Sequence, residues 1–142
     1  MQETPPHPLD WSAADAALAA LLMLRLAGTG SDAELTGYVA ATGSLAPHHS
    51  KMALLSALVP EMTDAPDGLE TVLDLIGAAR PDAAPTIYML SADYVALYGT
   101  ASPEEMRLLE KLGEALKIDR LTRAAFDVAA QARSAPLGEY DV

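Results

Sequence analysis

The 142-residue sequence predicts an all-α fold, a compact single domain of about seven helices, and three observations support this prediction. Apolar residues recur every three or four positions along most of the chain, which is the spacing of one helix face. Proline, glycine and capping residues divide these apolar runs into segments of helical length. Thr86–Met89 favours a strand, but no other stretch alternates with period two to pair with it.

The first expected helix covers residues 13–27 and follows Ser12, a favoured N-cap residue. Asp15 lies in its first turn, where the helix dipole favours an anion. The run Ala16–Leu24 is apolar on nearly every side, which predicts a central helix covered by others. Gly28 is expected to end this helix in the left-handed conformation that glycine adopts without steric cost.

Start and stop signals predict the remaining helices in order. They are expected at residues 31–42, 50–59, 69–79 and 86–98, with a sixth after Ser102 and a seventh after Asp119. Pro60 is expected to end the third, and Asp64 or Asp67 to cap the fourth. In the seventh, the inward-facing stripe is predicted to be Leu121, Ala125, Val128 and Ala132. The expected organisation is an extended arm at 1–11, a helical domain at 12–133 and a flexible tail at 134–142.

A short phrase occurs twice, as GTGSDAE from Gly28 and as GTASPEE from Gly99. In each copy a serine and a glutamate stand at capping-box spacing, Ser31 with Glu34 and Ser102 with Glu105. Each phrase therefore predicts a helix end, a tight turn and a new helix start. The repeat predicts two related helical halves, and helix capping explains the glycine, serine and glutamate shared by the two copies without any ligand.

Composition excludes several functional classes. The formal net charge is -11, from 20 acidic and 9 basic residues, which disfavours binding to nucleic acid or anionic lipid. The absence of cysteine excludes thiol catalysis, disulfides and thiolate zinc sites. The first residues lack the basic region of a secretory signal, and the apolar runs are too short to cross a bilayer, so a cytoplasmic protein is expected.

A long apolar helix, a glycine-containing turn and Ser-x-x-Glu, present twice in an acidic helical chain, resemble the tellurite-resistance TerB-like family. The second copy, YGTASPEEMRLLEKLGEALKID, is the better match, and the first, LAGTGSDAELTGYVAATG, is looser. The resemblance covers residues 12–133. It implies a compact helical domain in a tellurite or metal-stress response, with acidic surface sites for a divalent cation such as Ca²⁺, Mg²⁺ or Zn²⁺.

Carried onto this sequence, the resemblance implies four candidate metal ligands: Glu34, Glu105, Asp32 and Glu104. The family phrase also has an aspartate before each glycine, and here Ala27 and Tyr98 stand at those positions. A hard cation needs several oxygens held together, so we expect a weakened or lost metal site. Binding of a divalent cation is therefore expected to be weak or absent.

The histidine pair and Asp93 are further candidate site residues. His48 and His49 are adjacent, so on a helix they point in different directions and are expected to be surface or capping residues. Asp93 is expected to be partly buried, either as an acid with a raised pKa or paired with an arginine such as Arg25 or Arg123.

No catalytic set is recognisable, which favours a non-enzymatic protein. Two roles remain: a TerB-like protein that binds an ion or a protein partner, or a helical interaction module without a metal site. A second copy of the chain is one candidate partner.

Overall fold

The structure is a computed structural model that describes residues 11–28, 30–79, 81–98 and 102–135. It confirms the all-α prediction: the described residues form helices joined by short connections, with no strand among them. The elements in order are α1 (Ala13–Ala27), α2 (Asp32–Ala41), the 3₁₀ helix η1 (Ala46–Lys51), α3 (Met52–Asp64), α4 (Gly68–Gly77), the 3₁₀ helix η2 (Pro81–Ala83), α5 (Ala84–Tyr98), α6 (Pro103–Ala115) and α7 (Arg120–Ser134). Most of the predicted N-terminal arm and C-terminal tail lies outside the described residues.

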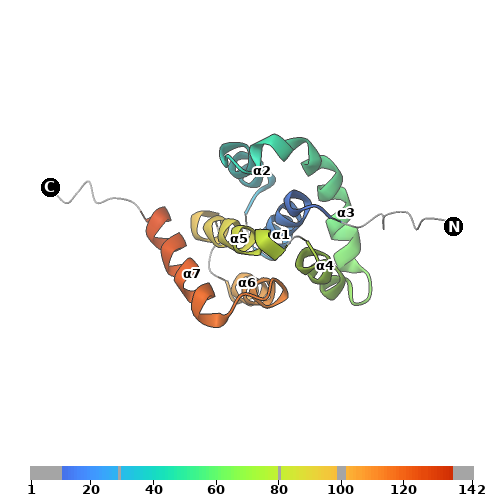
Figure 1. Cartoon of the computed structure of the whole chain (residues 1–142). Coiled ribbons are helices and arrows are strands. Elements are labelled where there is room, and N and C mark those ends of the chain that lie inside the picture. The colour runs from blue at the N-terminus through green and yellow to red at the C-terminus, as the bar shows by residue number, and fades with distance from the viewer. Residues whose placement is uncertain (1–10, 29, 80, 99–101, 136–142) are drawn as a thin grey trace.

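Helix α1 is the centre of the molecule, as its apolar sequence predicts (Figure 1). All residues from Ala16 to Leu24 are buried, and α2, α3, α4, α5 and α6 all contact this helix. Small alanines alternate with leucines along α1, so neighbouring helices can approach it closely on every side. No helix in the described part of the chain is both long and apolar enough to cross a membrane.

Helix α3 departs from the predicted boundaries at both ends. The prediction that Pro60 ends it is wrong, because the helix continues through this proline to Asp64. A proline inside a helix removes one amide donor and leaves the carbonyl four residues earlier without its partner. That carbonyl belongs to Ser56, which is exposed, so the carbonyl is not left in an apolar core. At the other end, η1 precedes the helix and contains both His48 and His49.

Helix α4 begins after Asp67, one of the two residues predicted to cap it. Asp67 occupies the N-cap position in a left-handed conformation, with φ 57°, but its side chain makes no capping hydrogen bond. Asp64, the alternative cap, is the last residue of α3 instead. The αα turn between α3 and α4 is therefore set by backbone conformation, and Gly68 fits it because a β-carbon there would overlap the carbonyl of Met62.

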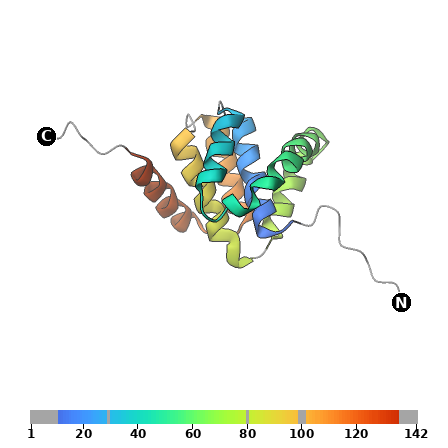
Figure 2. The same ribbon diagram turned by 90° about the horizontal axis from the view of Figure 1, so that it is seen from above.

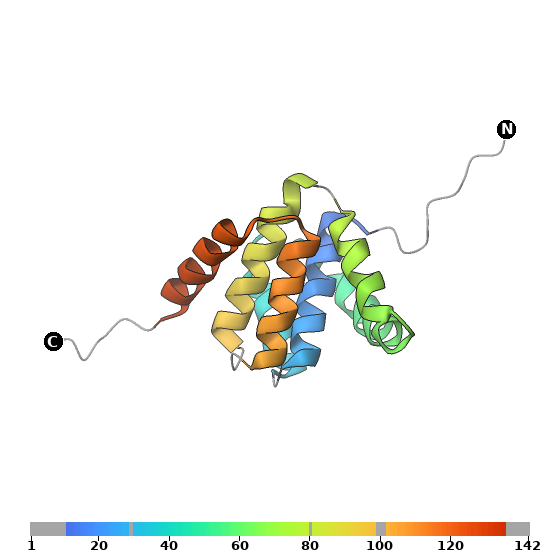
Figure 3. The ribbon, with the colours of Figure 1, turned by 90° about the horizontal axis from the view of Figure 1, so that it is seen from below.

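Helix α7 lies at one edge of the bundle and packs mainly on α5 (Figures 2 and 3). Asp119 caps it as predicted, by accepting a hydrogen bond from the Thr122 amide at 2.8 Å. The predicted inward stripe is wrong. Leu121 is 81% exposed and Val128 69% exposed, and the residues that face the bundle are Phe126 and Ala130. The helix is present where the sequence predicts it, but it is rotated by about half a turn.

Candidate functional site

The repeated phrase forms two helix starts, and both predicted capping boxes are confirmed. The Ser31 hydroxyl accepts from the Glu34 amide at 3.1 Å, and Glu34 Oε1 accepts from the Ser31 amide at 3.0 Å. The same reciprocal pair joins Ser102 and Glu105, at 3.2 and 3.1 Å. Ser12 and Asp15 form a third capping box, at the start of α1. The Ser and Glu of the repeat are therefore explained by helix capping.

Gly28 has a different role from the one predicted. Its φ is -111°, so it is not a left-handed cap, and it ends α1 in an extended conformation. A β-carbon at this position would overlap the carboxylate of Glu105, which is only 2% exposed. The glycine is needed because another helix start packs against it, and this contact joins the end of α1 to the start of α6.

The first turn also contacts α5 through Gly30. A β-carbon on Gly30 would lie 2.9 Å from the Tyr94 hydroxyl oxygen. Burial raises the pKa of Tyr94 to about 12; the charge of Arg25 opposes this rise, and the charges of Glu34 and Glu105 add to it. Both glutamates of the repeat are thus close to one tyrosine hydroxyl, so the starts of α2 and α6 lie at the same end of the bundle.

The tyrosines around this end form one aromatic cluster. Tyr38, Tyr94 and Tyr98 have ring centroids 5.6 to 6.1 Å apart, which is the range of favourable aromatic pairs. Tyr38 and Tyr94 are buried. Tyr88 lies elsewhere, beside Phe126 at 6.0 Å. The cluster therefore packs α2 against α5.

The four predicted metal ligands have different environments. Glu34 and Glu105 each cap a helix, and Asp32 Oδ1 lies 2.6 Å from Arg25 Nε, although that N–H does not point at the oxygen. Glu104 is exposed beside an apolar pocket on another face of α6. Over the described ranges, no group of three or more His, Asp or Glu side chains is arranged to hold a metal ion.

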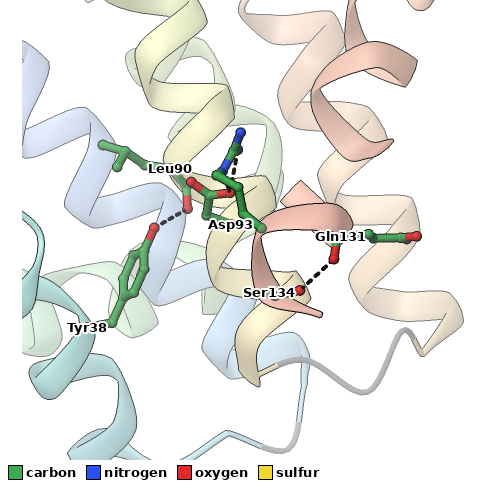
Figure 4. Close-up of polar contacts among 6 residues, drawn as sticks. Tyr38, Leu90, Asp93, Gln131 and Ser134 are labelled. Atoms are coloured by element: carbon green, nitrogen blue, oxygen red, sulfur yellow. Dashed lines mark hydrogen bonds and ion pairs between the residues drawn. The ribbon is translucent and has the colours of Figure 1, made fainter. Parts of the chain in front are cut away.

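Asp93 pairs with an arginine, but the partner is neither Arg25 nor Arg123. Its Oδ1 accepts from Arg133 Nη2 at 2.6 Å and from Nε at 3.1 Å, which joins α5 to the end of α7 (Figure 4). On the same stretch of α5, the Tyr38 hydroxyl donates to the Leu90 carbonyl at 2.9 Å. Burial, followed by the charge of Asp93, raises the pKa of Tyr38, so this hydroxyl keeps its proton at physiological pH.

The outer face of α7 carries the apolar residues that the sequence predicts to face inward. Leu121, Ala125, Val128 and Ala132 are all exposed, and their spacing places them along one side of the helix. Below we call these four residues the α7 stripe. Arg120 and Arg133 lie on either side of it by helical geometry. The sequence shows the stripe but not which way it faces.

Sequence analysis missed a basic pocket between α5, α6 and α7. Its volume is about 410 Å³. It is lined by three arginines, two carboxylates and an apolar wall: Arg107, Arg120, Arg123, Glu110, Asp127, Tyr88, Met106, Leu109 and Ala124. Below we call it the arginine pocket. Arg107 is on another helix from Arg120 and Arg123, and the chain is strongly acidic overall, so neither spacing nor composition indicated the pocket.

In comparisons with known proteins, no family model, no curated protein and no solved structure matches this chain. The resemblance to TerB-like proteins therefore stays a prediction. The function has to be argued from the geometry of this molecule.

Proposed function

We propose that this protein is a helical interaction module and that the α7 stripe binds an amphipathic helix with acidic edges. The observation that carries the proposal is the exposure of the stripe: Leu121 and Val128 are large apolar side chains left exposed on a helix that packs mainly on α5. Burying a leucine and a valine in an interface contributes roughly 1.5–3 kcal/mol each.

The stripe is suited to helix packing. Its residues are separated by four, three and four positions, which is the spacing of a coiled-coil seam. Two of the four are alanines, so a partner helix can approach the α7 backbone closely. No charged residue lies within the stripe, so burying it in an interface does not remove a charged group from water.

The arginines of α7 favour an acidic partner. Helix α7 carries Arg120, Arg123 and Arg133 against one carboxylate, Asp127, in a chain with a net charge of -11. It is therefore a positive element on a negative protein. A partner helix with carboxylates beside its apolar face would be attracted chiefly to Arg120, because Arg133 is already paired with Asp93.

The same charges disfavour a second copy of the chain as the occupant. Two α7 helices packed antiparallel through their stripes would place Arg120 of one copy near Arg133 of the other. The remaining parts of the two strongly acidic molecules would also repel each other at low salt. A different, acidic partner fits this face better.

The experiment uses two synthetic helical peptides with the same leucine and alanine face, one with glutamates at its edges and one with lysines. Fluorescence anisotropy should show that the full chain binds the glutamate peptide at least about tenfold more tightly. The double variant Leu121→Ser, Val128→Ser should lose about tenfold or more in affinity. Leu54→Ser is the matched control, because Leu54 is also 70% exposed but lies on α3.

Three results would overturn the proposal. These are equal binding of the two peptides, unchanged binding by the double variant, or a stable dimer in light scattering that the double variant dissociates. The last result would assign the stripe to a second copy.

Weak binding of a divalent cation in a tellurite or metal-stress response stays a separate prediction. It rests on the resemblance alone, and titration calorimetry with Ca²⁺, Mg²⁺ and Zn²⁺ tests it. Micromolar binding that is lost in the double variant Glu34→Ala, Glu105→Ala would show that these two glutamates bind a metal ion although both also accept capping hydrogen bonds.

A further inference from the structure

The arginine pocket lies between α7, α6 and α5, next to the edge of the stripe that Arg120 flanks. Arg107 comes from α6, Arg120 and Arg123 from α7, and Tyr88 from α5. The pocket therefore collects positive side chains from two helices around a space of about 410 Å³. This is within the size range of sites for small ligands.

Among the described residues, Arg107, Arg120 and Arg123 form no salt bridge, and neither do Lys111 and Lys117, but only the arginines meet at one pocket. Arg25 pairs with Asp32, Lys51 with Asp15 and Arg133 with Asp93, at 2.6 to 3.0 Å. In a protein with 20 acidic residues, three unpaired arginines at one pocket are a site where an external anion can bind.

Arg123 is held in place by its surroundings rather than by a carboxylate. Its Cδ lies over Gly113, where a β-carbon would overlap it, and its Nη1 donates to the Glu110 carbonyl at 3.1 Å. The stem is thus fixed against α6 before any ligand arrives. A guanidinium that is already positioned loses less conformational entropy when it binds an oxyanion.

The two carboxylates of the pocket do not neutralise it. Asp127 Oδ1 accepts from the Tyr88 hydroxyl at 2.8 Å, and this aspartate is partly buried at the α5–α7 contact. Glu110 is exposed. With three arginines against two carboxylates, the pocket is positive on a negative molecule. The exposed side chains of Met106 and Ala124 add an apolar wall, and the buried Tyr88 and Leu109 lie beneath it.

We infer that the arginine pocket binds a small organic oxyanion, with a carboxylate or phosphate on the arginines and a short apolar body against Met106 and Ala124. Guanidinium groups bind both oxyanions in a planar, two-point manner. This site goes beyond the proposed docking of a helix on the α7 stripe and does not depend on it.

The test is an NMR titration of the full chain with phenyl phosphate, benzoate, inorganic phosphate and benzyl alcohol. Phenyl phosphate or benzoate should shift the amides around Arg107 and Arg123 saturably, whereas benzyl alcohol, which lacks the charge, should not. Inorganic phosphate should bind more weakly than phenyl phosphate, because it has no apolar body to contact the wall, and equal binding would contradict the apolar part of the inference. The comparison of phenyl phosphate with benzoate identifies which oxyanion the site prefers.

Arg107→Gln and Arg120→Gln should each weaken binding about tenfold, since each removes a charge-assisted hydrogen bond. Both residues are exposed, so neither change should unfold the protein. Lys117→Gln is the control, because it removes an exposed charge three positions from Arg120 but outside the pocket.

The inference is overturned if neither organic anion binds, or if Lys117→Gln weakens binding as much as the arginine variants do. The latter result would indicate general electrostatic attraction. The double variant Leu121→Ser, Val128→Ser should retain anion binding, which separates this inference from the proposed function.

Discussion

The carboxylate of Glu105 occupies the space where a β-carbon on Gly28 would lie. One residue begins α6 and the other ends α1, so this contact joins two helix ends that are far apart in the sequence. Glu105 also accepts from the Ser102 amide, and its side chain is buried. The glutamate of the second phrase therefore caps its own helix and packs against the glycine of the first phrase.

Gly28→Ala should destabilise the protein by roughly 1–3 kcal/mol, because the added methyl group must displace a buried carboxylate that is held in a capping box. Gly37→Ala is the control. Gly37 lies within α2 with nothing near its missing β-carbon, so this change should stabilise the helix by about 0.5–1 kcal/mol. Urea unfolding measures both. Equal effects of the two substitutions would contradict the role assigned to Glu105.

The capping of helices was predictable because it depends on residues close in sequence. Ser31 with Glu34, Ser102 with Glu105, and Asp119 all cap as their spacing predicts. The need for glycine at position 28 was not predictable, because it comes from a contact with Glu105 on α6. A glycine after a helix suggests a left-handed cap, and only the tertiary structure shows that steric room is what it provides here.

Substitution of Leu21 and of Leu121 by alanine tests whether the two apolar faces that the sequence predicts to be buried contribute to stability. Leu21 is completely buried in α1, so Leu21→Ala should cost about 2–5 kcal/mol through lost burial and the resulting cavity. Leu121 is exposed, so Leu121→Ala should change stability by no more than about 0.5 kcal/mol. Thermal or urea unfolding compares the two. A large loss for Leu121→Ala in a monomer would mean that α7 faces inward after all.

The orientation of α7 could not be predicted from its sequence pattern. Apolar periodicity defines a helix and its stripe, but it cannot state whether the same chain covers that stripe. Helix α7 buries Phe126 and Ala130 on α5 and leaves the more regular stripe outside. The arginine pocket was hidden for a related reason, because its members come from separate helices and meet only after folding.

Helix α7 should exchange its amide hydrogens faster than α1. Ala130 is its one fully buried residue, whereas α1 is buried along most of its length, so local opening of α7 exposes little apolar surface. Asp93→Asn should increase exchange in α7 further, because it removes the charge that pairs with Arg133. Hydrogen exchange followed by mass spectrometry measures this. An equal increase in α1 would indicate global destabilisation instead of release of α7.

The interaction between Asp93 and Arg133 should be modest in size. Both side chains are partly exposed, so a double-mutant cycle with Asp93→Asn and Arg133→Gln should give a coupling free energy of about 0.5–1 kcal/mol. Unfolding in urea at low and at high salt provides the values, and the coupling should decrease at high salt. A coupling near zero at both salt concentrations would mean that the pair does not hold α7 on α5.

Asp127→Asn should stabilise the protein at neutral pH. Burial raises the pKa of Asp127 above its ordinary value of 3.8, against the lowering effects of the Tyr88 hydrogen bond and Arg123. As the pH rises through this range, the unfolded chain releases the proton first, so the native state loses stability from about pH 3.8 up to the folded pKa. Asparagine does not titrate, and its side-chain oxygen can still accept from the Tyr88 hydroxyl.

The difference between Asp127→Asn and the native chain should therefore grow with pH through that window and stay constant above it. Asp119→Asn, at the start of the same helix, is the control of opposite sign. The Thr122 amide hydrogen bond lowers the pKa of Asp119, so its carboxylate stabilises the native state above pH 3.8, and this contribution is lost as the pH falls through the folded pKa. Urea unfolding between pH 3 and pH 7 measures both variants. If Asp127→Asn were less stable at neutral pH, attraction to Arg123 would outweigh the cost of burying the carboxylate, and the arginine pocket would be less positive than inferred.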